Sequence, residues 1–480
     1  MRDRSELARL LIAIACVIAW NFGASFCYAY QTSECKVGYF DVDATPPLGS
    51  QLAYSPTQSV IEPLRCRGIV LMGSGKPIVM CSVDWLGIGN EGNLVFRERL
   101  GKAAGTTADR VAVHTIHQHD APWCDFSADA LAREHGASGI IFDSGFARIL
   151  LDRAEEAVRS AVANAQGVTH VALGEGQVEM VASNRRILGP DGRVKAVRWT
   201  ATKDPEVREE PEGVIDPLVR SISFFHENQR LVVLTYYATH PQSYYGKGDV
   251  NPDFPGMARN AREKATGVPH VHFCGAGGNV GAGKYNDGSP ENRPILAARL
   301  EAGMRLAYES ETRHSISSDA ISWSTIDVLL PVTPRLRLED VERIVRDPDR
   351  TLKERIYAAT QEIWMRRCEA KDPLTLQCLK IGSARILHMP GELFVEYQLA
   401  AQQMCPDAFV AMAAYGDYAP NYIGTAIAYE QGGYETEVRS TLVAPAVEGV
   451  LIEAMQQILK VERKPWPPLG VPQEELISQP

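Results

Sequence analysis

Val111-Ala-Val-His-Thr-Ile-His-Gln-His-Asp-Ala-Pro122 passes from an apolar strand into three histidines and a carboxylate. Alternate residues of a strand point to the same face, so we expect His117 and His119 to project together before a turn at Ala121-Pro122. Two neighbouring imidazoles can hold a metal ion, or one can hold it while the other moves protons. A polar strand end with solvated histidines is the alternative, but three histidines so close together favour a functional site.

The composition is that of an ordinary globular protein. The chain has 480 residues, of which 45% are hydrophobic and 22% charged, so it can bury a large core as one domain or two. The formal net charge is -10, which argues against nucleic acid or an anionic membrane as the main partner.

The N-terminus resembles a targeting segment. Arginines precede an apolar run at 10–20, which is too short to span a bilayer comfortably, and small residues surround a plausible cleavage point after Ala29. This order predicts a signal peptide at residues 1–29 and export to the periplasm or the medium. A lipid attached to Cys16 or Cys27 is the weaker alternative, because the preceding tripeptides fit poorly. Eight further cysteines permit disulfides in an exported chain, but their spacing does not give the pairing.

Hydrophobic patterning predicts one large α/β domain of mixed β-sheets flanked by helices, at residues 30–463, with a Pro-rich flexible tail at 464–480. Residues 188–214 are charged and short of large apolar residues, which predicts a long surface loop near the site. Strands are expected at 68–72, 77–84, 168–173, 178–181, 219–225, 231–237, 271–273, 383–387 and 409–414. Helices are expected at 93–101, 146–165, 256–266, 291–309, 338–346, 352–368, 394–404 and 443–461.

Four apolar strands are each followed by residues that can bind a metal or transfer protons. They lead into the histidine pair, into His240, into Glu392, and into a tyrosine-rich segment that begins at Tyr415. Side chains at the ends of neighbouring strands in one sheet converge, so we expect a metal site at these strand ends. Two histidines and a carboxylate are a common catalytic zinc set. Taken singly, His240 could be structural and Glu392 could favour the start of the following helix.

Residues from about Gly38 to Val461 resemble the catalytic domain of the neutral (alkaline, non-lysosomal) ceramidases, as a divergent, bacterial-type member. Six motifs in the family's order carry this resemblance: Asp43-Ala-Thr-Pro-Pro, His117-Gln-His119-Asp-Ala-Pro, Asn184-Arg185-Arg186, Asp216-Pro217 followed by Ala238-Thr-His240-Pro, Pro390-Gly-Glu392, and the pair Tyr422 and Tyr434.

The resemblance implies an exported zinc-dependent amidohydrolase that cleaves the amide bond of an N-acyl, ceramide-like lipid with zinc-activated water. A small-molecule or lipid amide is then the partner, with peripheral membrane contact through that substrate. The implied zinc ligands are His117, His240, Glu392 and Tyr422. His119 would deliver a proton, and Arg185 and Tyr434 would contact the substrate amide or the oxyanion. The implied substrate-binding positions are Asn184, Asn279 and Gly281.

The chain departs from the family at the loop Gly278-Asn-Val-Gly-Ala-Gly-Lys284. The family has Gly-Asp-Val-Ser-Pro-Asn here, so Asn279 replaces an acid and Gly281 a serine. This departure keeps two other functions open: a non-catalytic lipid- or glycan-binding descendant, and a zinc esterase or lactonase. The loop also has the spacing of a phosphate-binding loop, but Tyr285 replaces the hydroxyl residue that meets magnesium. Asp84, which follows an apolar strand, is interpreted as a satisfied polar strand end.

Overall fold

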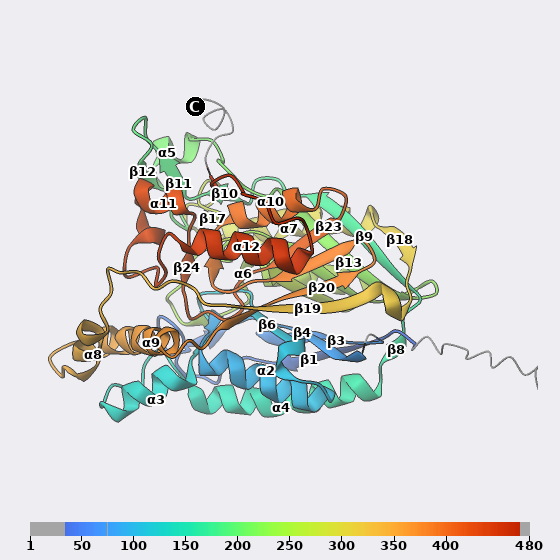
Figure 1. The fold of residues 1–480 in the computed structure, drawn as a ribbon, viewed down its shortest axis with the longest axis horizontal. Helices are drawn as coiled ribbons and strands as arrows, with labels where there is room; N and C mark the ends of the chain where they lie inside the picture. Colours follow the sequence, from blue (N-terminus) through green and yellow to red (C-terminus); the bar gives the residue numbers. More distant parts are fainter. Residues whose placement is uncertain (1–33, 74, 471–480) are drawn as a thin grey trace, which may run out of the picture. The chain divides into compact units, whose positions relative to one another are not determined.

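The computed structural model describes residues 34–73 and 75–470 (Figure 1). The predicted signal peptide at residues 1–29 and the end of the predicted tail at 471–480 lie outside the described residues. Within the described ranges, no helix combines the length and the apolar character needed to cross a membrane. Residues 464–470 form no helix or strand, yet Leu469 is buried and its N–H donates to Glu448.

The first of three large sheets is N-terminal and has the order β6-β4-β3-β1-β8. The helices α2 (Glu91–Ala104) and α4 (Ser144–Ala163) cover one face and lie along the bottom of Figure 1. Their apolar stripes close a core with Val79 and Val113 of the sheet, to which Phe96 and Leu150 contribute from the helices. The strands are β1 (Lys36–Asp43), β3 (Arg65–Gly73), β4 (Gly75–Val83), β6 (Val111–Thr115) and β8 (Gln166–Gly167).

The second and third sheets have the orders β16-β14-β13-β9-β18 and β19-β20-β21-β23. The second carries α6 (Asp253–Thr266) and α7 (Asn292–Glu309), and the third packs against α10 (Val395–Met404) and α12 (Val447–Leu459). Their strands are β9 (His170–Gln177), β13 (Leu218–His226), β14 (Gln229–Tyr237), β16 (His270–Cys274), β18 (Thr312–Ser315), β19 (Ile321–Val328), β20 (Leu374–Ile381), β21 (Ala384–His388) and β23 (Phe409–Ala413).

A common core joins the three sheets. Its buried side chains come from the first sheet (Ile69, Met80), the second (Phe224, Leu234) and the third (Leu379, Ile386, Ala411). These strands read as near-continuous apolar runs because both of their faces are covered. The predicted single α/β domain of mixed sheets is therefore confirmed.

Each large sheet contains one parallel strand pair joined by a crossover helix. The pairs are β4 and β6 with α2 between them, β14 and β16 with α6, and β21 and β23 with α10. Ligand sites in such units lie beyond the carboxyl ends of the parallel strands. The chain leaves these ends at the histidine pair, at His240, at Glu392 and at the tyrosine-rich segment.

Short ladders hold the loops that follow. The parallel pair β22 (Glu392–Leu393) and β24 (Tyr422–Ile423) sets Glu392 directly beside Tyr422. The antiparallel pair β10 (Ser183–Asn184) and β17 (Val280–Gly281) joins the Asn184 segment to the glycine loop. The other elements are β2 (Ser59–Val60), β5 (Gly87–Ile88), β7 (Trp123–Cys124), β11 (Arg186–Leu188), β12 (Val194–Val197), β15 (Asp249–Val250), α3 (Phe126–Glu134), α5 (Pro205–Glu209), α8 (Leu338–Arg346), α9 (Leu352–Glu369), α11 (Ala426–Gln431), η1 (Ala108–Arg110), η2 (Ser318–Ala320) and η3 (Tyr434–Thr436).

Three expectations from the sequence are corrected. Residues 178–181 form no strand, because β9 ends at Gln177 and the chain turns there. Residues 188–214 are not a structureless loop: the hairpin of β11 and β12 and the helix α5 occupy them. The buried Arg198 organises this segment, because its guanidinium donates to the carbonyl oxygens of Val207, Glu210 and Pro211. The strands β19 and β20 were not expected at all. The eight cysteines in the described ranges are free thiols.

Candidate metal centre and active site

The two histidines of the 111–122 stretch meet, but not by strand geometry. The strand β6 ends at Thr115, and His117 adopts a left-handed conformation with φ 63°. The expectation that both residues lie on one face of a strand was therefore wrong. The sharp turn at His117 brings its Nε2 to 3.3 Å from Nε2 of His119 instead. A non-glycine residue in this conformation costs free energy, which is common where a functional side chain must be aimed.

The segment that follows β4 fixes the His117 loop. The Nδ1 atom of His117 donates to the Leu86 carbonyl over 2.8 Å, which leaves its Nε2 with a free lone pair. The Thr115 hydroxyl donates to the same carbonyl over 3.1 Å, and the Gln118 N–H donates to the Trp85 carbonyl. The ring of His117 is therefore held in both orientation and tautomer.

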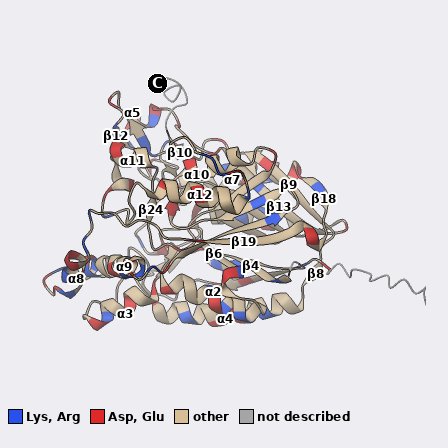
Figure 2. Cartoon of the chain, viewed as in Figure 1, with Lys and Arg blue, Asp and Glu red and all other residues tan. Residues whose placement is uncertain are grey.

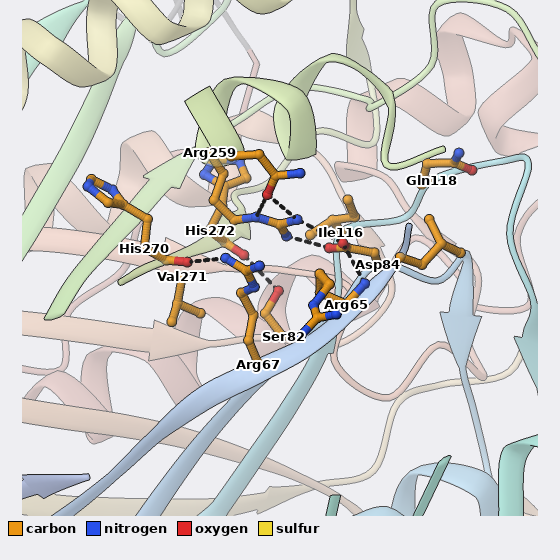
Figure 3. Close-up of polar contacts among 12 residues, drawn as sticks. Arg65, Arg67, Ser82, Asp84, Ile116, Gln118, Arg259, His270, Val271 and His272 are labelled. Atoms are coloured by element: carbon orange, nitrogen blue, oxygen red, sulfur yellow. Dashed lines mark hydrogen bonds and ion pairs between the residues drawn. The ribbon is translucent and has the colours of Figure 1, made fainter. Parts of the chain in front are cut away.

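A buried ion pair lies under this support (Figure 3). Both Asp84 oxygens accept from the Arg259 guanidinium of α6, over 2.5 and 2.8 Å, and both side chains are fully buried. Asp84 also accepts from the Arg65 N–H, so both carboxylate oxygens have hydrogen-bond partners. The interpretation of Asp84 as a satisfied polar residue at a strand end is therefore confirmed. Nearby, the Ser82 hydroxyl donates to the His272 carbonyl. These bonds tie β4 to the second sheet and its helix.

His240 and Glu392 complete the cluster from the second and third sheets. The Nε2 of His240 lies 3.1 Å from that of His117, and its Nδ1 donates to the Gly277 carbonyl. One oxygen of Glu392, Oε1, accepts from the Tyr418 hydroxyl over 2.7 Å. The other, Oε2, lies 3.3 Å from Nε2 of His117 and 3.4 Å from Nε2 of His240, and it is buried without a hydrogen-bond partner. The expected convergence occurs, but from three sheets rather than one.

These atoms fit a metal ion. Ligands bound at 2.0–2.1 Å in a tetrahedral zinc site lie about 3.3–3.4 Å apart, close to the separations observed. The Nε2 lone pairs of His117 and His240 and the orphaned Oε2 of Glu392 point at one another. His117, His119 and His240 also form a buried group that could hold a metal ion. Burial raises the pKa of the Glu392 carboxyl, but the His117 ring and the tyrosine hydroxyls outweigh this and hold its pKa below the usual value. The carboxylate is thus ready to ligate.

His119 is set apart by its tautomer. Its Nδ1 accepts from the Gln242 amide over 2.8 Å, so the ring proton lies on Nε2, which faces the other histidines. Burial lowers the pKa of His119 well below its usual value, and the neighbouring His117 lowers it further. The Tyr54 ring stacks on the imidazole at 5.4 Å. This arrangement suits a proton donor better than a metal ligand.

Arg185, Tyr422 and Tyr434 lie together beside the cluster. The Tyr422 hydroxyl accepts from Arg185 over 3.1 Å, and its ring stacks near His240 at 6.3 Å. The Arg185 guanidinium is buried, lies 3.6 Å from Glu435 and sits 5.8 Å above the Tyr434 ring. Burial raises the pKa of the Tyr422 hydroxyl well above its usual value. A neutral phenol and a fixed cation therefore face the same space.

The three expected substrate-binding positions differ in their surroundings. A methyl group added at Gly281 would lie 3.6 Å from Cβ of His240, so this glycine borders the cluster. The Asn279 side chain accepts from the Val395 N–H and donates to both Glu396 oxygens, which ties the glycine loop to the start of α10. The Asn184 side chain donates to the Val214 carbonyl and accepts from the Arg186 N–H.

A pocket of about 520 Å³ opens beside His119 and Glu392. Sequence reasoning missed most of its walls. Tyr54, Tyr357 and Trp123 are far apart in the chain and carried no motif, whereas Tyr418 lies in the tyrosine-rich segment. The lining residues are Ala53, Tyr54, Leu86, His119, Trp123, Tyr357, Glu392, Tyr418, Asn421, Tyr422, Tyr434, Arg439 and Ser440.

Comparison with known proteins identifies the fold. No protein-family model matches the chain, and no curated protein sequence matches it. The neutral ceramidase from Pseudomonas aeruginosa superposes with a TM-score of 0.62 at 17% identity, over 92% of this chain and 77% of that one. A ceramidase complexed with C2 gives 0.63 at 17% identity, over 91% of this chain and 77% of that one. The chain therefore has the fold of these ceramidases.

Proposed function

We propose that the protein is an exported, zinc-dependent amidohydrolase that cleaves the amide bond of an N-acyl lipid. One observation carries the proposal: the lone pairs of His117 and His240 and the orphaned Oε2 of Glu392 meet at zinc-ligand spacing beside an open pocket. Because Nδ1 of His117 and of His240 each donates to a carbonyl, these three atoms have no proton to share among themselves.

The zinc ligands in this proposal are His117, His240 and Glu392, with the Tyr422 hydroxyl as the fourth. A bound zinc ion would lower the pKa of a water molecule and polarise the substrate carbonyl. The buried Arg185 and the phenol of Tyr434 offer donors towards the negative charge that develops on the carbonyl oxygen.

His119 is the proton donor to the leaving amine. Its Nε2 proton points into the cluster, and Gln242 fixes that tautomer from behind. The Tyr54 ring stacks on the imidazole and holds its orientation. Asn184, Asn279 and Gly281 would bound the substrate from the side of His240, where Gly281 leaves room that a larger residue would fill. The shared fold with a ceramidase complexed with C2 supports an N-acyl lipid as the first substrate class to test.

The test is hydrolysis of a fluorogenic N-acyl amide by the purified protein. We expect turnover that a chelator abolishes and added zinc restores, and that His240→Ala removes. The exposed His314 provides a matched control, because His314→Ala should keep full activity. Absence of turnover with zinc bound would favour a non-catalytic lipid- or glycan-binding protein. Turnover of esters or lactones but not amides would move the assignment to an esterase.

A further inference from the structure

The pocket beside the cluster is unusual in its walls. Five tyrosines and one tryptophan line it, and its aliphatic side chains are Ala53 and Leu86. Phenol-lined walls suit a polar or compact group better than a long alkyl chain, which needs continuous apolar surface. The lining of the pocket therefore suits a polar part of the substrate as well as an acyl chain.

Two cations lie against these tyrosines. The Lys353 ammonium of α9 is 5.8 Å from the ring centroid of Tyr54 and 5.8 Å from that of Tyr357. The Arg439 guanidinium lies 5.4 Å from the Tyr434 ring and lines the pocket itself. Arg439 shares its charge with Glu437 over 2.6 Å. Lys353 has no ion-pair partner among the described residues, and the neighbouring carboxylate, Glu354, caps α9 through Thr351.

Among the described residues near the pocket, Lys353 lacks the ion-pair partner that Arg439 has, although the protein as a whole is acidic. Glu392 is the carboxylate among the lining residues, and it belongs to the proposed zinc set. The chain as a whole has a net charge of -10, and Figure 2 shows acidic and basic side chains interspersed over the outer helices α3, α4 and α8. An exposed lysine without an ion-pair partner, beside two of the tyrosines that line the pocket, attracts an anion to that point.

We propose that the leaving amine of the substrate carries an anionic group, such as a carboxylate, a few carbon atoms from the amide nitrogen. This inference rests on the proposed function, because it takes His119 as the proton donor to that amine. His119 and Lys353 both lie beside the Tyr54 ring, at 5.4 and 5.8 Å from its centroid, so the anion must lie about the width of that ring away from the amide nitrogen. In the reaction the oxygen of water bonds to the acyl carbon, the C–N bond breaks, and the amine departs with a proton.

The test compares two ligands of equal length, N-hexanoyl-4-aminobutyrate and N-(4-hydroxybutyl)hexanamide, for binding by calorimetry and for kcat/KM. We expect the anionic compound to be favoured threefold to tenfold, and the preference to shrink as salt rises, since one exposed ionic contact contributes about 1 kcal/mol. Lys353→Ala should bring the ratio of the two close to one, Lys353→Glu should invert it, and Lys353→Arg should keep it. Lys264→Ala, at an exposed lysine of α6, is the matched control and should leave the ratio at its wild-type value.

The two readouts separate the two proposals. Equal binding of both compounds by the wild type, or an unchanged ratio in Lys353→Ala and Lys353→Glu, would overturn the anion inference even if both amides are hydrolysed. A binding preference that follows the charge at position 353 without any turnover would support anion recognition and contradict the proposed hydrolase.

Discussion

Two groups of buried histidines, one containing His114 of β6 and the other His117 just after its end, are built differently. In the cluster of His117, His119 and His240, two Nδ1 atoms donate to carbonyls and the Nε2 atoms face one another and Glu392. In the pair of His114 and His388, Nδ1 of His114 bonds to the Ala414 carbonyl over 2.7 Å, and its Nε2 meets Nδ1 of His388 over 2.9 Å. The two rings of the pair therefore hydrogen-bond to each other.

This difference shows why burial alone does not mark a metal site. The pair keeps a single orphaned atom, Nε2 of His388, and no second described donor is aimed at the same point. In the cluster, the Nε2 atoms of three histidines face one another and the orphaned Oε2 of Glu392. Zinc needs converging lone pairs rather than nearby rings. The cluster should therefore respond to metal, and the pair to pH.

The largest expected effect comes from Glu392→Gln. The amide keeps the shape and can still accept from Tyr418, but it removes the charge that the metal ion needs. We expect the rate of hydrolysis of the fluorogenic amide to fall a thousandfold or more, because the proposed reaction depends on the metal ion that this carboxylate charge helps to bind. Glu311→Gln, at a buried carboxylate bound to Arg230 outside the site, is the control, and it should alter stability without loss of zinc. Near-normal activity of Glu392→Gln would remove Glu392 from the zinc set.

Arg259→Met tests the support beneath the cluster. It leaves Asp84 buried without its partner, and breaking such a pair costs about 3–5 kcal/mol of unfolding free energy. The measurement is urea unfolding of the protein. The double variant Asp84→Leu with Arg259→Met should recover most of the loss, because neither charge then remains buried. A loss below about 1 kcal/mol in the single variant would mean that the pair does not brace this region.

The pair should make the fold sensitive to acid. Burial lowers the pKa of His114 to about 4, against 6.5 for the unfolded chain. As pH falls, the unfolded chain binds the proton first, so stability is complete above about pH 6.5 and declines towards pH 4, by about 3 kcal/mol for this residue. His114→Gln can preserve both hydrogen bonds and should reduce this decline. The measurement is the unfolding free energy from urea titrations between pH 7 and 4.5. An equal decline of this free energy in the wild type and in His114→Gln would contradict this role.

The smallest expected effect concerns the tautomer of His119. In Gln242→Glu the carboxylate would accept a hydrogen bond from Nδ1 of His119 instead of donating one to it. The ring proton would then lie on Nδ1 and the lone pair on Nε2. We expect about a tenfold loss of kcat with zinc retained, as is typical when a hydrogen-bond partner behind an active-site histidine is changed. Gln242→Asn serves as the uncharged comparison. A pH–rate profile identical to that of the wild type would show that Gln242 does not set the proton position.

The sequence predicted most helices and strands because these depend on local apolar patterns. The apolar runs at 219–225 and 231–237 became β13 and β14 within two residues at each end. The conformation of His117 was not predictable, because its positive φ results from contacts with Leu86 and Trp85 far back in the chain. Tyr54 and Lys353 were missed for the same reason: only the tertiary fold brings these distant segments to His119.

Zinc content of the purified protein tests the account most directly. The measurement compares the wild type with His117→Ala and with His388→Gln, which changes a buried histidine of the pair. We predict about one zinc ion per chain in the wild type and in His388→Gln, and less than about one tenth in His117→Ala. A wild type without zinc, or a His117→Ala protein that keeps it, would contradict the assignment of the histidine cluster as a metal centre.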